Sequence, residues 1–375
     1  MVNKERVKKL FLDLALINGP SKQEREVADF VKSKLASLGL EVEEDDSGSK
    51  IGGSAGNVLA FARGNVPGAK AIFLSCHLDT IEPTAQLSPM IDGESIRSDG
   101  TTILGADDRA GIAAGIEGVQ SLVEDGARHG DFQVLFSVSE EVGLCGAKFM
   151  DHSKIRAQLG YIFDTQKPVA GITISAPSHE SMSVEITGKA AHAGIAPENG
   201  VSAIVAASRA IARMKLGRID EETTANVGVI SGGKARNIIP DQASVKAEAR
   251  SRSEAKLVAQ VEHMRRTFEE DAAAIGAEAR VESQREYSSY RFSEADEVVK
   301  LAMRASRRIG IEPRFEEGGG GSDANIFNSA GISAVVVGVG FDNAHTSMEC
   351  IGLDDLAKAA EFAESLIITA AEPEE

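Results

Sequence analysis

Apolar residues in the first part of the chain form short continuous runs, separated by segments in which they recur every three or four positions. Continuous runs predict strands buried on both faces, and the three-to-four spacing predicts amphipathic helices. The same pattern resumes near the end of the chain. The predicted elements are helices over 4–17, 21–39, 110–123, 294–309 and 354–369, and strands over 57–63, 71–76, 133–138, 161–163 and 332–339. This pattern is typical of an α/β domain with a mostly parallel sheet and helices on both faces.

Between residues 177 and 286 the strands alternate apolar and polar positions instead. Alternation predicts a sheet with one face in water. The predicted elements are, in order, strand 178–189, helix 200–214, strands 225–230 and 243–249, helix 254–275 and strand 278–283. This β-α-β-β-α-β order is the ferredoxin-like arrangement, a self-contained α+β unit. We therefore predict that residues 177–286 are inserted, as a separate domain, into a larger α/β domain formed by residues 1–176 and 287–375.

Two local signals predict where helices begin. Ser21 and Glu24 have the spacing of a capping box at the start of the second helix. The glycine run 318–321 precedes Ser322 and Asp323, either of which can cap the helix that follows. The run lacks the Lys-Ser/Thr of a phosphate-binding loop and does not indicate nucleotide binding. We expect its glycines to form part of a site wall, since they let a ligand approach the backbone closely.

Composition and charge narrow the class of protein. A chain of 375 residues with 42% apolar and 26% charged residues has ample material for two folded domains. Its formal net charge of -17 argues against nucleic acid or an anionic membrane surface as a partner. The start shows no signal-peptide pattern, and the apolar run 332–339 is too short to cross a bilayer. Three cysteines fit a reducing compartment, so we expect a cytoplasmic protein.

Polar residues with metal-binding side chains follow the predicted strands or adjoin Gly-rich turns. They are His77 and Asp79, Asp107 and Asp108, Glu140 and Glu141, Asp164, and His345. Each is weak evidence alone. Acidic pairs also favour helix starts and solvated turns, a lone aspartate can cap a loop, and a lone histidine is often a surface residue. Together they indicate one site at the rim of the sheet.

Two imidazoles and three carboxylates are the minimum for a pair of divalent ions that share a bridging carboxylate. This donor set suits Zn²⁺, with Co²⁺ or Mn²⁺ as alternatives. A water bound between two such ions becomes a nucleophile near neutral pH. A further carboxylate that binds no metal is then needed to take the proton from that water. The sequence therefore predicts a metal-dependent hydrolase.

These motifs resemble those of the peptidase T / aminoacylase / carboxypeptidase G superfamily, whose members are di-zinc peptidases and deacylases. The motifs are His77-Leu78-Asp79-Thr80, Gly105-Ala106-Asp107-Asp108-Arg109-Ala110-Gly111, the Glu140-Glu141 pair, Asp164 and His345. The resemblance extends over essentially the whole chain, with the inserted domain in the expected place. It implies that His77 and Asp164 bind the first metal, that Asp107 bridges, and that Glu141 and His345 bind the second.

The same resemblance implies roles for residues that bind no metal. Glu140 would be the general base, and Asp79 would orient His77. The chain departs from many members at Arg109, where they have lysine; the positive charge is kept, and the residue is not a ligand.

In the inserted domain, the resemblance implies that His192 reaches into the partner's active site and stabilises the oxyanion there. Asn237 and Arg250 resemble contacts to the substrate, and Arg250 suits a bidentate grip on a peptide carboxylate. The alternatives are a loop histidine and a surface arginine. We expect a homodimer through the inserted domain, because its edge strand can pair across a two-fold axis.

We predict a metal-dependent aminopeptidase that hydrolyses short peptides, with tripeptides preferred, since Gly105–Gly111 resembles peptidase T more than the acetylornithine-type deacylases. An N-acyl amino acid deacylase or a dipeptidase with the same site is the alternative. The segment 140–147 also resembles the glutamyl/leucyl aminopeptidases, but their extra domain precedes the bridging aspartate, whereas here it follows Asp164. A catalytically silent metal-binding scaffold is disfavoured, because it would have no use for an unliganded Glu140.

Overall fold

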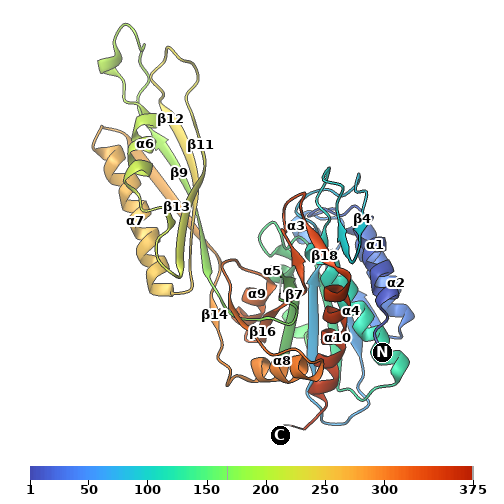
Figure 1. Ribbon diagram of the computed structural model, residues 1–375. Helices are drawn as coiled ribbons and strands as arrows, with labels where there is room; N and C mark the ends of the chain where they lie inside the picture. The colour runs from blue at the N-terminus through green and yellow to red at the C-terminus, as the bar shows by residue number, and fades with distance from the viewer. Residues whose placement is uncertain (167, 374–375) are drawn as a thin grey trace. The chain divides into compact units, whose positions relative to one another are not determined.

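The fold is that of a computed structural model, which describes residues 1–166 and 168–373. The chain forms two compact units, drawn in Figure 1. The first unit consists of residues 1–174, 292–317 and 322–375, and the second of residues 175–291 and 318–321. The glycine run 318–321 therefore belongs to the second unit, although the residues on both sides of it belong to the first.

The first unit contains a large sheet with the strand order β1-β2-β6-β3-β7-β16-β8. These strands are β1 (Glu41–Glu44), β2 (Val58–Ala62), β3 (Ile72–His77), β6 (Phe132–Ser137), β7 (Leu159–Thr165), β8 (Ile172–Ala176) and β16 (Ser333–Gly338). The central strands β6, β3, β7 and β16 are parallel, and the pairs toward both edges are antiparallel. The prediction of a mostly parallel sheet is confirmed for the centre, where every residue of β3 and β6 is buried.

Helices cover both faces of this sheet, as Figure 1 shows with α4 and α10 on one side and α5 and α9 on the other. The ring of Phe163 in β7 packs 6.0 Å from that of Phe362 in α10, and the ring of Phe73 in β3 lies 5.1 Å from that of Phe327 in α9. The helices are α1 (Lys4–Ala15), α2 (Arg25–Ser37), α3 (Ser47–Ile51), α4 (Ala106–Asp125), α5 (Cys145–Phe149), α8 (Glu297–Arg308), α9 (Asp323–Ser329) and α10 (Leu353–Ala370). Burial on both faces explains why the central strands are continuously apolar.

Short strands complete the first unit. They are β15 (Phe315–Glu317), which pairs with β8, and a small antiparallel sheet of β17 (Phe341–Asp342), β18 (Cys350–Gly352), β5 (Ser95–Arg97) and β4 (Met90–Asp92), in that order. The small sheet matters for the site because the loop between β17 and β18 carries His345.

The second unit has the predicted ferredoxin-like arrangement. Its elements are β9 (Ser178–Thr187), α6 (Ala203–Arg213), β10 (Gly217–Arg218), β11 (Thr223–Gly232), β12 (Gln242–Ser251), α7 (Glu254–Ala273), β13 (Glu278–Tyr287) and β14 (Tyr290–Arg291). The strand order is β10-β11-β12-β9-β13, with every pairing antiparallel. Buried and more exposed positions alternate along β9 and β12, as expected for a sheet covered by helices on one face.

The predicted capping box at Ser21 and Glu24 is wrong. The helix α2 begins four residues later than Ser21, and the residue before it, Glu24, makes no side-chain capping bond. The carboxylate of Glu24 accepts instead from the backbone and hydroxyl of Ser139. At the start of α9 the expected cap is present, since the Ser322 hydroxyl accepts from the backbone N–H of Ala324 and a reciprocal bond involves Asn325.

None of the helices that the described residues form combines the length and the apolarity needed to cross a bilayer.

Candidate metal centre

The carboxyl ends of three adjacent parallel strands carry most of the predicted ligands. His77 is the last residue of β3, and Asp164 lies one residue before the end of β7. Glu140 and Glu141 follow β6, whose last residue is Ser137. Because β3 pairs with both β6 and β7 in parallel, these side chains meet at one edge of the sheet.

The two nitrogens of His77 face different groups. Its Nε2 lies 3.0 Å from Oδ1 of Asp107 and 3.6 Å from Oδ1 of Asp164. Its Nδ1 lies 3.0 Å from the backbone carbonyl of Asp79 and 3.4 Å from the carboxylate of the same residue. Asp79 therefore holds one ring nitrogen, which leaves the other directed at two carboxylates, as a metal ligand requires.

Asp107 lies between the two histidines. One of its oxygens faces His77, and the other lies 3.3 Å from Nε2 of His345. His345 Nε2 is also 3.0 Å from Oε1 of Glu141. The structure therefore brings together all five predicted ligands, with one carboxylate placed to contact both halves of the set.

Burial and charge shift the pKa values of this set strongly. Hydrogen bonds with Asp107 and Glu141 raise the pKa of His345 to about 10. Burial acts to lower the pKa of His77, but its contacts with Asp107, Asp164 and Asp79 outweigh burial and raise it. Burial raises the pKa of Asp164 to about 7. Several carboxylates held together out of water favour a cation between them.

The donors fit two divalent ions. Oε1 of Glu141 is buried and lies 3.0 Å from His345 Nε2, so the two atoms face each other as ligands of a shared ion would. Ligand atoms of His77, Asp107 and Glu141 lie within 4.8 Å of one another, as do those of His77, Asp108 and Asp164. Oδ2 of Asp108 accepts the backbone N–H of His77 at 3.1 Å, and its Oδ1 is buried with no hydrogen-bond donor among the described residues.

Glu140 stands apart from this set. Its side chain is almost fully buried, yet among the described residues none donates a hydrogen bond to its carboxylate. Burial raises its pKa, and the nearby charge of Asp164 adds to the effect. A carboxyl group with a raised pKa beside candidate metal ligands has the properties of a proton acceptor and donor.

Hydrogen bonds to Asp79 fix the turn that carries the two glutamates. The backbone N–H groups of Glu140 and Glu141 donate to the Asp79 carboxylate at 3.0 and 3.2 Å. The Ser21 hydroxyl donates to the same carboxylate at 2.6 Å. The sequence predicted that Asp79 would orient His77. It did not predict that Asp79 also accepts the backbone N–H groups of Glu140 and Glu141, or that Ser21 donates to it.

Arg109 is fully buried beneath the site. Its guanidinium donates to the carbonyl of Leu78 and, at 3.4 Å, to that of Gly19. Burial lowers its pKa to about 10, against the attraction of Asp79 and Asp108. The positive charge compensates buried carboxylates next to the site, and the side chain points at the backbone rather than at the ligand atoms.

Sequence reasoning missed two further buried carboxylates. Glu349 accepts the backbone N–H groups of Gly105 and Asp107, and burial raises its pKa to about 7. Asp323 accepts the Ser137 hydroxyl, and burial raises its pKa to about 6. Only one signal was available in the sequence: Glu349 comes four residues after His345, within the same loop.

The three predicted site residues of the second unit lie on its surface or half-buried. His192 is exposed, and its segment pairs with Ile238 in an antiparallel bridge that brings Asn237 beside it, with the Ala193 N–H donating to the Asn237 carbonyl. Arg250 is half-buried and donates to Glu248 at 3.0 Å. Its buried Nε has no hydrogen-bond acceptor among the described residues, so the guanidinium keeps donor capacity for a ligand.

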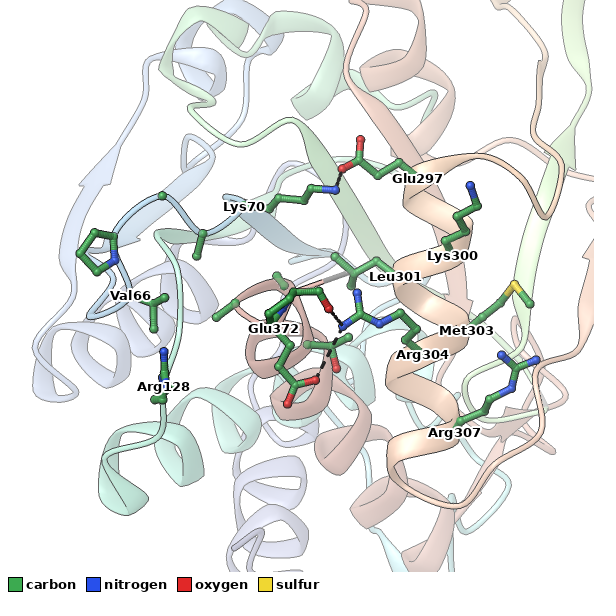
Figure 2. Close-up of a pocket in the computed structure, with 17 residues that line it drawn as sticks. Val66, Lys70, Arg128, Glu297, Lys300, Leu301, Met303, Arg304, Arg307 and Glu372 are labelled. Atoms are coloured by element: carbon green, nitrogen blue, oxygen red, sulfur yellow. Dashed lines mark hydrogen bonds and ion pairs between the residues drawn. The ribbon is translucent and has the colours of Figure 1, made fainter. Parts of the chain in front are cut away.

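A cavity of about 720 Å³ lies elsewhere in the first unit, at the amino ends of the parallel strands. It is lined by the loop 66–70 before β3, by α8 and by the end of α10 (Figure 2). Its central cations are already paired, Lys70 with Glu297 and Arg304 with Glu372. The candidate chemistry is at the opposite, carboxyl edge of the sheet, so we do not assign function to this cavity.

Two protein-family models match parts of the chain. Residues 176–275 match the peptidase dimerisation domain of the M20 family. Residues 91–180 match the M42 glutamyl aminopeptidases. The second match includes Asp107, Glu140, Glu141 and Asp164, and the first covers most of the second unit.

Relatives match both units together. The chain is 41% identical to the uncharacterized protein YqjE of Bacillus subtilis, over 99% of this chain and 100% of that protein. It resembles the crystal structure of aminopeptidase PepT from Bacillus cereus, with 41% identity, a TM-score of 0.92, and coverage of 99% of this chain and 100% of that one. A tripeptidase structure from Staphylococcus aureus gives 37% identity and a TM-score of 0.95, with 99% of each chain covered.

Proposed function

Since this chain belongs to the peptidase T-like members of the M20 peptidase family, we propose that it is a metal-dependent aminopeptidase acting on short peptides, preferentially tripeptides. The observation that carries the proposal is that both imidazoles of the donor set, His77 and His345, face one carboxylate, Asp107, at different oxygens. The similar structures of an aminopeptidase and a tripeptidase support the choice of substrate.

The proposed metals are two divalent ions, Zn²⁺ or alternatively Co²⁺ or Mn²⁺. His77 and Asp164 would hold one, Glu141 and His345 the other, and Asp107 both, in line with the contacts between these side chains. When bound, such ions polarise a carbonyl group and lower the pKa of a water molecule toward neutrality.

Glu140 is the proposed general base. Its carboxylate is buried and free of hydrogen bonds from the described residues, and it precedes the candidate ligand Glu141 on the same turn, so it can accept a proton from water and deliver it to the leaving amine. Burial, together with the nearby charge of Asp164, raises its pKa, which makes it a stronger proton acceptor. Asp79 supports both parts of the site, since it holds the His77 ring and the backbone of Glu140.

The second unit supplies the proposed substrate contacts. Arg250 would bind the peptide's C-terminal carboxylate, for which its guanidinium has the matching geometry, and Asn237 would make a polar contact. His192 would donate to the oxyanion that forms during attack on the peptide carbonyl. The side chain of His192 is exposed, as is needed if it is to contact the active site of a partner subunit.

We further propose a homodimer through the second unit. The short β10 pairs with β11 only at Thr224 and Ala225. Beyond these residues β11 pairs with β12 on one side, and no strand of the described part of the chain pairs with its other side. Val229 and Ile230 on this part of β11 are 53% and 48% exposed. An open edge with exposed apolar residues favours pairing with a second copy. A cytoplasmic location is proposed in addition, supported by three free cysteines.

A substrate panel tests the proposed activity. The purified protein is assayed with di-, tri- and tetrapeptides and with N-acetylated versions of each, after loading with Zn²⁺, Co²⁺ or Mn²⁺. We expect release of the N-terminal residue, fastest from tripeptides, and no turnover of acetylated peptides or of metal-stripped protein. Faster hydrolysis of the acetylated series would identify a deacylase instead. Equal rates with the metal-stripped protein would overturn the metal-dependent mechanism.

A further inference from the structure

Glu349 is a buried carboxylate without a place in the mechanism proposed above. Its side chain is 1% exposed, and its two oxygens accept separate backbone N–H groups, from Gly105 at 2.6 Å and from Asp107 at 2.8 Å. It binds no side chain of the donor set. Its contacts are instead with the backbone of the residue that carries the bridging carboxylate.

The conformation of the 105–107 segment is shaped to receive this carboxylate. Gly105 has a φ of 72°, a left-handed value that favours glycine, and a Cβ there would approach Thr80 Cγ2 to 3.1 Å. Successive backbone N–H groups in such a turn form a concave site for an anion. Here the anion is supplied by a residue 242 positions away from Asp107.

One loop therefore holds Asp107 from two directions. His345 contacts the Asp107 carboxylate at 3.3 Å, and Glu349, four residues later, binds the N–H of the same residue. A shift of the Asp107 backbone would move its carboxylate relative to both imidazoles. The N–H bonds to Glu349 oppose that shift, since a buried N–H that loses its acceptor is costly.

We propose that Glu349 is a positioning residue that fixes the bridging carboxylate of Asp107 at the distance required by both metal ions. The proposal rests on the two-metal function proposed above. Because both ions would share Asp107, loss of Glu349 should lower the affinity of the protein for both ions. Loss of a ligand that binds a single ion, such as His345, should lower chiefly the affinity for that ion.

The test measures metal affinity rather than turnover. Apo-protein is titrated with Co²⁺ and with Zn²⁺ against a chromophoric chelator for wild type, Glu349→Ala, Glu349→Gln and His345→Ala. Glu349→Ala removes both acceptors. Glu349→Gln keeps the volume and one acceptor but turns an NH₂ group toward the other N–H. We expect both dissociation constants to rise, by about 10- to 100-fold for Glu349→Ala and less for Glu349→Gln, a range typical of residues that orient metal ligands.

Gln133→Ala is the matched control. Gln133 is 4% exposed, and its Oε1 accepts the backbone N–H groups of Arg156 and Ala157, but it lies near the amino end of β6, away from the site. It should lower the melting temperature and leave both metal affinities unchanged. Wild-type affinity in both Glu349 variants would overturn the positioning role alone. A wild-type protein that binds no divalent ion would overturn the proposed function as well. If Glu349→Ala does not fold, Glu349→Gln decides the result.

Discussion

The backbone N–H of Glu140 donates to the carboxylate of Asp79 at 3.0 Å, across 61 positions of sequence. The same carboxylate lies 3.4 Å from Nδ1 of His77. One side chain thus couples the end of β3 to the turn after β6. The pKa of Asp79 is lowered, because its contacts with His77 and Ser21 outweigh the effect of burial, so it remains an anion that accepts all of these bonds.

Asp79→Asn should reduce activity by about 10- to 100-fold, as substitutions behind metal ligands typically do. An amide in this place turns an NH₂ group toward one of the donating N–H groups of Glu140 and Glu141. We expect lower metal content together with lower kcat. Ser21→Ala, which removes one donor to Asp79, should have a smaller effect in the same direction. Full activity and metal content in Asp79→Asn would contradict the coupling.

The core of the fold was predictable because its strands are buried on both faces. The segments 71–76 and 133–138 were expected as strands and form Ile72–His77 and Phe132–Ser137. The strand Glu41–Glu44 was not expected, because it lies at the sheet edge, has more exposed residues and carries charged side chains. The start of α2 was placed too early for a different reason: Ser21 points to Asp79 rather than to its own helix.

The candidate ligands were predictable as a cluster because each lies beside a strand end or a turn that the sequence marks. The residues that support them were not, because their partners are backbone N–H groups far away in sequence. Glu349 binds Gly105 across 244 positions, and Glu24 binds Ser139 across 115. Local sequence gives no sign of such a partner. The spacing of Ser21 and Glu24 matched a capping box, so the sequence predicted a helix cap where Glu24 in fact binds Ser139.

Glu140→Gln should abolish turnover and leave metal binding close to that of wild type. The amide keeps the shape of the side chain but cannot accept a proton from water. A loss of about 10²–10⁴-fold in kcat is the usual range for such a group. Glu141→Gln is the comparison, since it should lose metal as well as activity. Metal analysis together with steady-state kinetics distinguishes the two, and metal loss in Glu140→Gln would reverse the assignment.

His192→Ala should lower kcat by about 10²–10³-fold, the usual effect of removing one oxyanion donor, while the fold remains intact because the side chain is exposed. His263→Ala, in α7 of the same unit, is the control and should keep normal kinetics. Unchanged kinetics in His192→Ala would make this histidine a surface residue.

Mixed dimers test whether His192 acts across the interface. Co-expression of His192→Ala with Glu140→Gln gives some dimers with one copy of each. If His192 reaches the partner's site, one of the two sites in such a dimer is complete, and random pairing restores about a quarter of wild-type activity. If it acts within its own chain, no site is complete and the mixture stays inactive.

Binding of metal should release protons and tighten as pH rises. In the metal-free protein the pKa of His345 is about 10, raised by Asp107 and Glu141, and the pKa of His77 is raised as well. The His345 imidazole therefore carries a proton at pH 7, and the raised pKa of His77 favours the protonated ring there as well, but coordination requires the neutral ring. The free form holds more protons than the bound form, so higher pH favours binding over the whole range below the raised pKa values.

Calorimetric titration with Zn²⁺ at pH 7, in buffers of different ionisation enthalpy, measures this release directly. We expect at least one proton per protein when both ions bind, released from the His345 imidazole. His345→Gln has no proton to lose at this position and should release about one fewer. Below pH 7 the release should increase further, because burial raises the pKa of Asp164 to about 7 and its proton must also leave. Binding heats that do not depend on the buffer would show that the imidazoles are already neutral before metal binds. That result would contradict the raised pKa values of His77 and His345.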